Sequence, residues 1–407
     1  MNSDARFRWA VGIEDTFIPQ LRTRTGRTLD EYELTDHYAQ WRDDLGLAAD
    51  VGADTMRYGI PWYRVNPAPG RFDWEWTDAV VEHLVGRLRI TPIIDLMHYG
   101  TPLWLERQFV NPDYPQRVAE YAHAVADRYR DQISWYTPLN EPRINARLCG
   151  LNGTWPPYLR GWPGYVRMTL ALARGISLAI AAIREAVPNA TIVQVEATEA
   201  IRTADPSLHD EQRLQQEHQY LATDVVLGRV DERHPLSDWL SRHGAPDDDL
   251  AWLRSHAQQV DVLGINYYPE LSPKTLVRTG ERVVRRRGGG WTAELEQILT
   301  DWHARYGRPL MITETSAIKA VRGRLRWLDA SVGVVAEARR GGLPVIGYTW
   351  WPLFSLVAWA YRGGRKPVAS YFAHMGLWDL RPDNGTLRRV RTPVADRFAA
   401  IVREGAQ

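Results

Sequence analysis

Cysteine, net charge and long apolar runs are all scarce in this chain. One cysteine, Cys149, occurs among 407 residues, so no intrachain disulfide can form. The formal net charge is +1, which gives no electrostatic reason to expect a nucleic-acid partner. No run of about 18 apolar residues predicts a membrane span, and residues 1–6 lack the apolar core of a signal peptide. We therefore expect a cytoplasmic protein without nucleic-acid or membrane partners, whereas its oligomeric state is not predictable from the sequence.

Phenylalanine is also scarce, but the other two large aromatic residues are abundant. The chain has 7 phenylalanines beside 18 tryptophans and 18 tyrosines. Trp and Tyr combine an apolar ring face with a polar group. Such rings suit sugar binding, because the C–H face of a pyranose lies flat on an aromatic face. A large ordinary core would account for the same composition, so both interpretations stay open at this point.

Eight apolar, β-prone segments alternate with segments of helical periodicity. No break in composition marks a linker, and this alternation is typical of parallel strands covered by helices. We predict one (β/α)8 barrel, a TIM barrel, spanning residues 1–407 as a single domain with enlarged βα loops. An open doubly wound sheet is the second choice, because no Gly-x-Gly-x-x-Gly follows the first strand. The predicted strands are 7–12, 55–60, 90–97, 133–139, 191–195, 260–268, 309–313 and 344–350.

Two inserted regions stand out between these strands. Residues 207–259 contain several helical pieces and indicate a larger insertion. Residues 278–290 are rich in arginine and glycine, and we interpret them as a solvated, mobile loop at the barrel mouth rather than a phosphate site.

Polar and aromatic side chains follow the predicted strands where each one ends. In a (β/α)8 barrel the active site lies at this carboxyl end. Asn140 and Glu141 follow the fourth strand, directly before Pro142, and Glu314 ends the seventh. The other candidates at strand ends or in the last loop are Arg57, His98, Asn266, Tyr268, Trp351 and Trp359. Glu14, Asp15, Glu196 and Glu199 also follow strands, and we expect them to support the site or lie at the surface.

Two carboxylates at one barrel mouth, without a cluster of metal ligands, point to glycoside hydrolysis. One carboxyl group protonates the leaving oxygen while the other attacks the sugar or activates water. Arg57 and Tyr268 would keep Glu314 ionised by charge and hydrogen bonding, whereas Glu141 has the apolar flank Leu139–Pro142. The sequence predicts no cofactor and no metal; the partner expected is a small-molecule glycoside.

Several of these motifs resemble glycoside hydrolase family 1. Asn140-Glu141-Pro142 is similar to the acid/base motif of the family, and Ile312-Thr313-Glu314 to its nucleophile motif. The resemblance implies a retaining β-glycosidase in which Glu141 is the acid/base, Glu314 the nucleophile and Asn140 a ligand of the sugar 2-hydroxyl. Further similar stretches are Asp261–Tyr268, Arg57 with Trp62, His98, Gly347-Tyr348 with Trp351, and Trp359-Ala360-Tyr361.

The chain departs from the family pattern where the sugar is held. Phe17 or a neighbour replaces the usual glutamine after the first strand, and Tyr99 replaces the tryptophan after His98. Ala358 replaces the glutamate that binds the sugar 4- and 6-hydroxyls. We therefore expect a non-standard hexose, a pentose, a deoxysugar or a natural-product glycoside rather than a plain glucoside. Arg362, Arg365 and Lys366 are weak candidates for contacting an anionic sugar.

Two other functions are compatible with these residues. A transglycosidase or biosynthetic enzyme for a secondary metabolite would use the same covalent intermediate. A non-catalytic carbohydrate-binding barrel would explain the altered sugar-binding positions.

Overall fold

The structure is a computed structural model that describes residues 6–19 and 23–405. Residues 1–5, on which most of the expectation about a signal peptide rests, lie outside the described residues.

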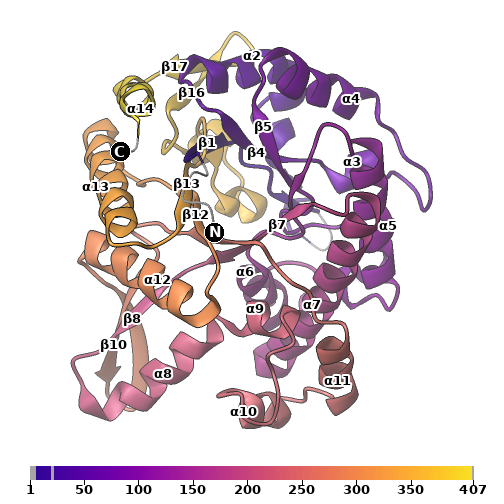
Figure 1. Cartoon of the computed structure of the whole chain (residues 1–407), viewed down its shortest axis with the longest axis vertical. Helices are drawn as coiled ribbons and strands as arrows, with labels where there is room; N and C mark the ends of the chain where they lie inside the picture. The colour runs from indigo at the N-terminus through magenta and orange to yellow at the C-terminus, as the bar shows by residue number, and fades with distance from the viewer. Residues whose placement is uncertain (1–5, 20–22, 406–407) are drawn as a thin grey trace.

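Eight parallel strands close into a barrel at the centre of the molecule (Figure 1). Their order around the barrel follows their order in the chain, and the last strand pairs with the first. The predicted (β/α)8 barrel is confirmed, and the open doubly wound sheet is wrong because this last pairing leaves no edge. The barrel strands are β1 (Arg8–Gly12), β4 (Thr55–Gly59), β5 (Thr91–Asp95), β6 (Trp135–Thr137), β7 (Thr191–Ala197), β9 (Val262–Asn266), β12 (Leu310–Thr315) and β13 (Val345–Trp350).

The barrel strands are buried on both faces, which explains why they are nearly continuous apolar runs. All the residues of β4, β9 and β12 are buried. Side chains from several strands fill the interior as one small apolar cluster that includes Ala10, Ile93, Val193, Val262 and Met311. The barrel is therefore a packed core, and the site can form only at its end.

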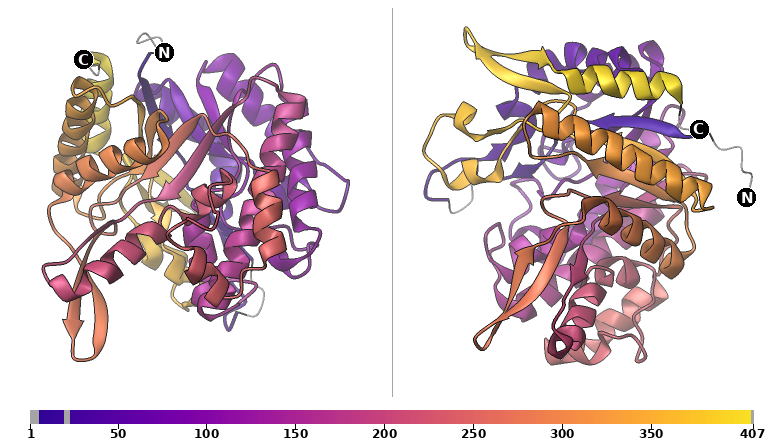
Figure 2. Two further views of the ribbon diagram at one scale, coloured as in Figure 1. Left: turned by 60° about the horizontal axis from the view of Figure 1, so that its bottom comes forward. Right: turned by 90° about the vertical axis from the view of Figure 1, so that its left-hand side faces the viewer.

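Helices surround the barrel, and most of them bury apolar side chains against the strands or against one another (Figure 2). Their periodicity was the main signal for them in the sequence. They are α1 (Glu31–Leu34), α2 (His37–Asp50), α3 (Trp62–Val65), α4 (Glu75–Val81), α5 (Tyr114–Arg128), α6 (Pro142–Ala146), α7 (Gly161–Ala186), α8 (His209–His218), α9 (Leu221–Val226), α10 (Ser237–Arg242), α11 (Asp247–Ser255), α12 (Trp291–Tyr306), α13 (Val321–Arg340) and α14 (Pro393–Glu404). Short 3₁₀ or π segments include η1 (Glu82–Arg87), η2 (Gln108–Val110), η3 (Arg147–Leu151), η4 (Pro206–Leu208), η5 (Trp359–Gly363) and η6 (Val368–Tyr371).

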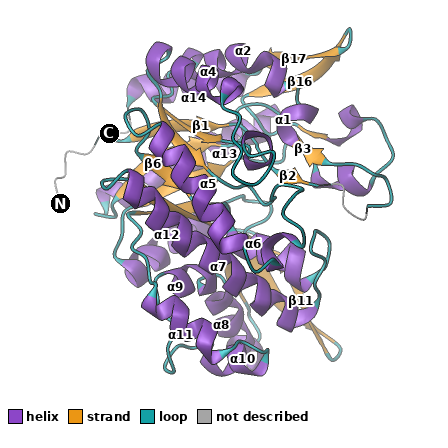
Figure 3. Cartoon of the chain, turned by 90° about the vertical axis from the view of Figure 1, so that its right-hand side faces the viewer, coloured by secondary structure: helices purple, strands orange, loops and turns teal. Residues whose placement is uncertain are grey.

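Helix α7 is long and apolar enough to cross a membrane by length and composition, which the sequence analysis did not anticipate. It has 26 residues and a mean hydropathy of 1.6 in its most apolar window. However, 67% of that window is buried inside the fold, where α7 packs against α5, α9 and α11 (Figure 3). The apolar side chains of α7 are thus accounted for by burial in the helical layer.

The arginine-rich segment forms a hairpin rather than the predicted irregular loop. Strands β10 (Pro273–Thr279) and β11 (Arg282–Arg287) pair antiparallel, and β8 (Ala200–Arg202) adds a third strand. All residues of β11 are exposed, so its expected solvation is confirmed. One of its side chains, Arg285, nevertheless contacts the buried Glu199. Smaller pairs are β2 (Phe17–Ile18) with β3 (Leu29–Asp30), β14 (Leu356–Val357) with β15 (Phe372–Ala373), and β16 (Trp378–Asp383) with β17 (Thr386–Arg391).

Candidate active site

Glu141 lies between the end of β6 and the start of α6, in an unusual backbone conformation. Its φ is 45° and its ψ is 62°, in the left-handed region that non-glycine residues rarely adopt. Pro142 begins α6, because proline fits the first turn of a helix, where its missing N–H is not needed. The side chain accepts hydrogen bonds from Asn266 Nδ2 at 2.8 Å and from the Tyr99 hydroxyl.

Glu314 lies on β12 at a break in the regular pairing. The register of β12 against β9 shifts between Ile312 and Glu314, and such irregularities commonly redirect a side chain beside an active site. Arg57 donates to Glu314 Oε1, and the Tyr268 hydroxyl donates to Oε2 at 2.7 Å. The expected contacts of Glu314 with Arg57 and Tyr268 are therefore present.

Arg57 connects the second carboxylate to the rest of the site. Its guanidinium is fully buried and also donates to Asp95 Oδ2 and, at 2.6 Å, to Asn140 Oδ1. Arg57 also lies over the ring of Trp351, at 4.8 Å from the ring centroid. Because a guanidinium cannot accept a hydrogen bond, the Asn140 contact fixes the orientation of that amide.

With its oxygen toward Arg57, the Asn140 amide presents its N–H groups to His98 and Tyr99 as hydrogen-bond donors. Its Nδ2 faces His98 Nε2 at 2.8 Å and the Tyr99 hydroxyl at 3.0 Å. Burial lowers the pKa of His98, but Asp15 and Glu14 outweigh burial and raise it well above the usual value. These carboxylates therefore favour a protonated imidazole. The contact between Asn140 Nδ2 and His98 Nε2 opposes protonation, because two donors would then face each other. His98 Nδ1 lies 2.7 Å from Asp15 Oδ1 and is placed to donate to it.

A cavity of about 430 Å³ opens at the carboxyl end of the barrel, and most of the predicted residues line it. Both carboxylates face it, together with aromatic and amide side chains. The predicted residues that line this catalytic cavity are Glu141, Glu314, His98, Asn266, Tyr268 and Trp359. Trp359 is 37% exposed and packs edge-on against Tyr99 and Trp155, so its predicted position at a sugar platform is compatible with the structure.

Three predicted substrate-binding residues lie behind the cavity wall instead. Arg57, Asn140 and Trp351 are 0% exposed and do not line the cavity. The Trp351 ring is stacked on His98, and its Nε1 donates to Glu14 Oε2 at 3.0 Å. Each of these side chains is held by protein partners and supports residues that reach the cavity, and its predicted contact with the substrate stays a prediction.

The two carboxyl groups influence each other through their charges. Burial raises the pKa of Glu314 to about 8; Arg57 lowers it, and the negative charge of Glu141 raises it again. The raised pKa by itself would keep much of Glu314 protonated at neutral pH. The ion pair with Arg57, a charged donor that Glu141 lacks, opposes this shift and favours the ionised carboxylate.

One neighbouring cluster has the side-chain types of a metal site. Potential ligand atoms of Asp15, Asp95 and His98 lie within 4.8 Å of one another. However, Arg57 already donates to Asp95 Oδ2, and its positive charge opposes a bound cation at this position. We therefore derive no catalytic step from a metal.

Comparison with known proteins agrees with this geometry. A family model described as Glycosyl hydrolase family 1 matches residues 10–367. The chain belongs to glycosyl hydrolase family 1. It is therefore a glycosidase of a family that acts on β-glycosides, and the resemblance found in the sequence motifs is confirmed.

Several curated relatives are 24–28% identical to this family 1 chain over the aligned residues. Beta-glucosidase A of Thermotoga maritima is 25% identical over 356 residues, which cover 80% of this chain and 79% of the relative. A bifunctional β-D-glucosidase/β-D-fucosidase of Bifidobacterium breve is 28% identical, covering 91% and 90%. The solved structure of a Thermotoga maritima β-glucosidase with deoxynojirimycin superimposes with a TM-score of 0.82 at 20% identity, covering 98% and 97%, which supports the fold.

Two residues that matter in this family 1 site were missed or misjudged from the sequence. Glu14 was expected to support the site or lie at the surface, but it lines the cavity. Tyr99 was noted only as a departure from the family, yet its hydroxyl donates to Glu141 and it lines the cavity. The sequence did contain a signal for this role of Tyr99, because a Tyr in place of Trp next to His98 introduces a hydroxyl that can donate a hydrogen bond.

The positions expected to depart from the family pattern lie differently relative to the cavity. Ala358 lines the cavity with a methyl group, at the position where the motif resemblance implies a carboxylate. Phe17 does not line the cavity, and its ring stacks on Tyr63 with centroids 3.5 Å apart. Arg362 donates to the backbone oxygen of Pro19 and to the Tyr158 hydroxyl. Arg362, Arg365 and Lys366 do not line the cavity, and their contact with an anionic sugar stays a prediction.

Proposed function

We propose that this chain hydrolyses a β-glycoside by double displacement with retention of configuration. Glu314 is the nucleophile and Glu141 the acid/base. The observation that carries the proposal is that both carboxyl groups face one cavity but have different partners. Glu314 is bonded to the charged Arg57, whereas the partners of Glu141 are the neutral Asn266 and Tyr99.

In the first step, Glu314 attacks the anomeric carbon while Glu141 gives its proton to the departing glycosidic oxygen. The bond from the anomeric carbon to that oxygen breaks, and an ester between Glu314 and the sugar forms. In the second step, Glu141 takes a proton from water as the water oxygen attacks the same carbon. Glu314 leaves as a carboxylate, so both groups return to their starting protonation states.

Residues around the carboxylates match the needs of these two steps. Arg57 stabilises Glu314 as a nucleophile and as a leaving group, because both require negative charge on its carboxylate. Tyr268 donates to the other Glu314 oxygen and would orient it toward the sugar. Thr313 Oγ1 donates to Asn266 Oδ1 at 2.7 Å, which fixes the Asn266 amide with its N–H toward Glu141.

The sugar is proposed to lack the hydroxyl pattern of glucose. Ala358 cannot replace the two hydrogen bonds of a carboxylate, and bonds to charged groups are worth about 1.5–3 kcal/mol each. Curated relatives include enzymes named for glucosides, for fucosides and, in Clostridium longisporum, for 6-phosphoglucosides. Family membership therefore leaves the sugar open, and a deoxysugar, a pentose or a hexose of different stereochemistry fits Ala358 best.

Covalent trapping tests this proposal. A panel of activated 2-deoxy-2-fluoro-β-glycosides of several sugars should inactivate the enzyme and leave one sugar on the peptide that contains Glu314, as measured by mass spectrometry. The rate of labelling across the panel would also rank the sugars. Failure of every sugar in the panel to label Glu314, or labelling at another carboxylate, would overturn the assignment.

A further inference from the structure

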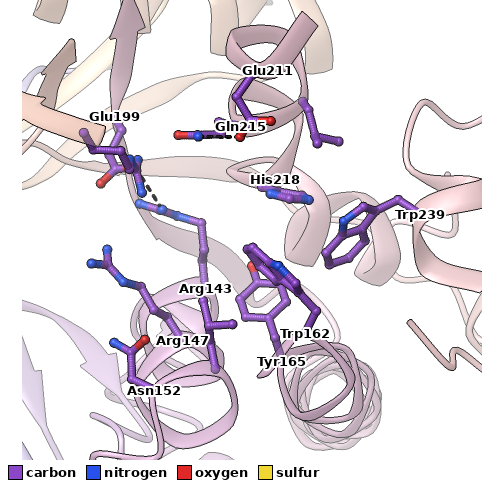
Figure 4. Close-up of a pocket in the computed structure, with 13 residues that line it drawn as sticks. Arg143, Arg147, Asn152, Trp162, Tyr165, Glu199, Glu211, Gln215, His218 and Trp239 are labelled. Carbon is purple, nitrogen blue, oxygen red and sulfur yellow. Dashed lines mark hydrogen bonds and ion pairs between the residues drawn. The ribbon is translucent and has the colours of Figure 1, made fainter. Parts of the chain in front are cut away.

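A second cavity of about 380 Å³ adjoins the catalytic cavity (Figure 4). We call it the side cavity; it is bounded by α6, η3, α7, α8, α10 and β11. Arg143, Arg147 and Glu199 line both the side cavity and the catalytic cavity. A ligand that extends from the catalytic carboxylates past these three residues would therefore enter the side cavity.

The junction of the two cavities carries an excess of positive charge. Arg143, Arg147, Lys274 and Arg285 surround the buried carboxylate of Glu199. Burial alone would raise the pKa of Glu199, but these four cations lower it to about 2, so it is ionised. Arg143 contacts Glu199 at 3.2 Å, and Arg285 contacts the same oxygen. Burial raises the pKa of a second carboxyl beside Arg143, that of Glu196, to about 8. Even with Glu211 of the side cavity counted as a negative charge, the four cations outnumber the carboxylates.

Arg147 is the cation of this group that has no partner. Arg143 and Arg285 contact Glu199, and Lys274 donates to the backbone oxygen of Leu271, whereas the Arg147 guanidinium has no hydrogen bond or ion pair in the described part of the chain. Burial lowers the pKa of Arg147; Glu199 raises it, and the charges of Arg143 and Arg285 lower it again. A half-buried guanidinium without a partner is costly, and an anion placed at the junction would remove that cost.

The far side of the side cavity is aromatic. Trp162 packs edge-on against Trp239 with ring centroids 5.2 Å apart, and Tyr165 and His218 lie beside them. Figure 4 shows Arg143 and Arg147 on one side of the cavity and Trp239 on the other. Trp162 is 38% exposed, so its ring is available to a ligand.

Unused hydrogen-bonding atoms lie between the cations and the aromatic wall. His218 Nε2 and Gln215 Oε1 are buried without a partner among the described residues. Burial, Arg143 and Arg285 lower the pKa of His218 to about 4, so its imidazole is neutral at neutral pH. From the junction outward, the side cavity therefore offers first an anion site, then polar atoms and then an aromatic surface.

We propose that the side cavity binds the aglycone of the substrate, and that this aglycone carries an oxyanion close to the glycosidic bond, followed by an aromatic body. The proposal rests on the proposed function, because that function places the sugar in the catalytic cavity. The order of the parts follows from the layout: sugar at Glu141 and Glu314, oxyanion at Arg147, and ring at Trp162. A carboxylate and a phosphate share the required chemistry.

The test measures binding without using catalysis. Isothermal titration of the whole protein with 2-naphthoate, 2-naphthyl phosphate and the neutral 2-naphthamide compares carboxylate, phosphate and uncharged forms of one ring system. We expect at least one anion to bind about tenfold or more tightly than the amide, the ratio expected for a charge-assisted hydrogen bond. The anion that binds more tightly shows whether the site prefers a carboxylate or a phosphate.

Three variants locate the effect. Arg147→Gln should abolish the preference for the anion. Arg286→Gln should keep it, because Arg286 lies on the same strand as Arg285 and is exposed, but lines neither cavity. Trp162→Ala should weaken all three ligands. Equal binding of anion and amide by the unmodified protein, or equal loss in the Arg147 and Arg286 variants, would overturn the proposal.

This result is independent of the outcome for the proposed function. If fluoro-sugars fail to label Glu314 while the anion preference and its loss in Arg147→Gln are observed, the mechanism is wrong and the anion site stands. If labelling succeeds and the preference is absent, only the assignment of the side cavity is wrong.

Discussion

The two ends of the catalytic cavity follow the family to different degrees. At the end with the two carboxylates, Glu141 is bonded to Asn266 and Glu314 to Tyr268, and Arg57 and Asn140 join the two pairs. At the other end, Ala358 stands where the motif resemblance implies a carboxylate. Under the proposed function, the chemistry and the specificity of this barrel are carried by separate loops, so one can change while the other is kept.

The largest expected effect is at the end of the cavity with the two carboxylates. Glu314→Ala should lower kcat for an activated aryl glycoside by about four orders of magnitude or more, because it removes the proposed nucleophile. Added azide or formate should partly restore turnover. Glu294→Ala is the control, since Glu294 is a buried carboxyl on α12 outside the catalytic cavity, paired with Arg202. Full activity in the Glu314 variant would show that Glu314 is not the nucleophile, and the contrast between the two ends of the cavity would no longer hold.

Tyr99→Phe tests a residue that departs from the family motif and donates to Glu141. Loss of its hydrogen bond to Glu141 should lower kcat/KM for alkyl glycosides by about tenfold, because poor leaving groups need the proton most. A dinitrophenyl glycoside should be much less affected. Tyr129→Phe is the control for loss of a tyrosine hydroxyl. Tyr129 follows α5 and donates to Asp78, and it does not line the catalytic cavity. Equal losses for both leaving groups would show that Tyr99 does not act through Glu141.

Ala358→Glu tests the altered end. A restored carboxylate should raise kcat/KM for an aryl β-glucoside about tenfold, since one hydrogen bond to a charged group is worth about 1.5–3 kcal/mol. The same change should lower kcat/KM for the preferred sugar. Ala358→Gln, which has similar size and no charge, should give a smaller gain. No gain with glucosides in either variant would mean that specificity is set elsewhere in the cavity.

The smallest expected effect is a shift in pH dependence. The proposed nucleophile Glu314 must be ionised, and its pKa is raised to about 8, so kcat/KM should rise as pH increases through this value. The negative charge of Glu14 contributes to raising the pKa of Glu314. Glu14→Gln should therefore move the acidic limb to lower pH, as measured by kcat/KM against pH. A limb that stays in place or moves to higher pH would contradict this electrostatic account.

The sequence predicted the barrel well because its signals are local. Eight apolar segments with helices between them fix this fold, and each predicted strand overlaps an observed one. The main error was the arginine-rich segment, now β10 and β11. Its exposed side chains give no alternation of apolar and polar residues, so nothing in the sequence marked it as a strand pair.

The site was predicted less completely, because position in the chain does not say which side chains face a cavity. Motifs placed Glu141 and Glu314 correctly at the mouth. Whether Arg57, Asn140 and Trp351 reach the substrate depends on the neighbours that cover them, which only the packed structure reveals. The side cavity was also invisible, since its lining comes from α7, α8, α10 and β11, far apart in the sequence.

The stereochemistry of the first product tests the central claim most directly. Proton NMR of early hydrolysis, with whichever nitrophenyl β-glycoside is turned over, separates the two anomers before they interconvert. Double displacement through Glu314 predicts that the β-anomer forms first. Initial formation of the α-anomer would mean that water attacks the substrate directly, and would contradict the assignment of Glu314 as a nucleophile.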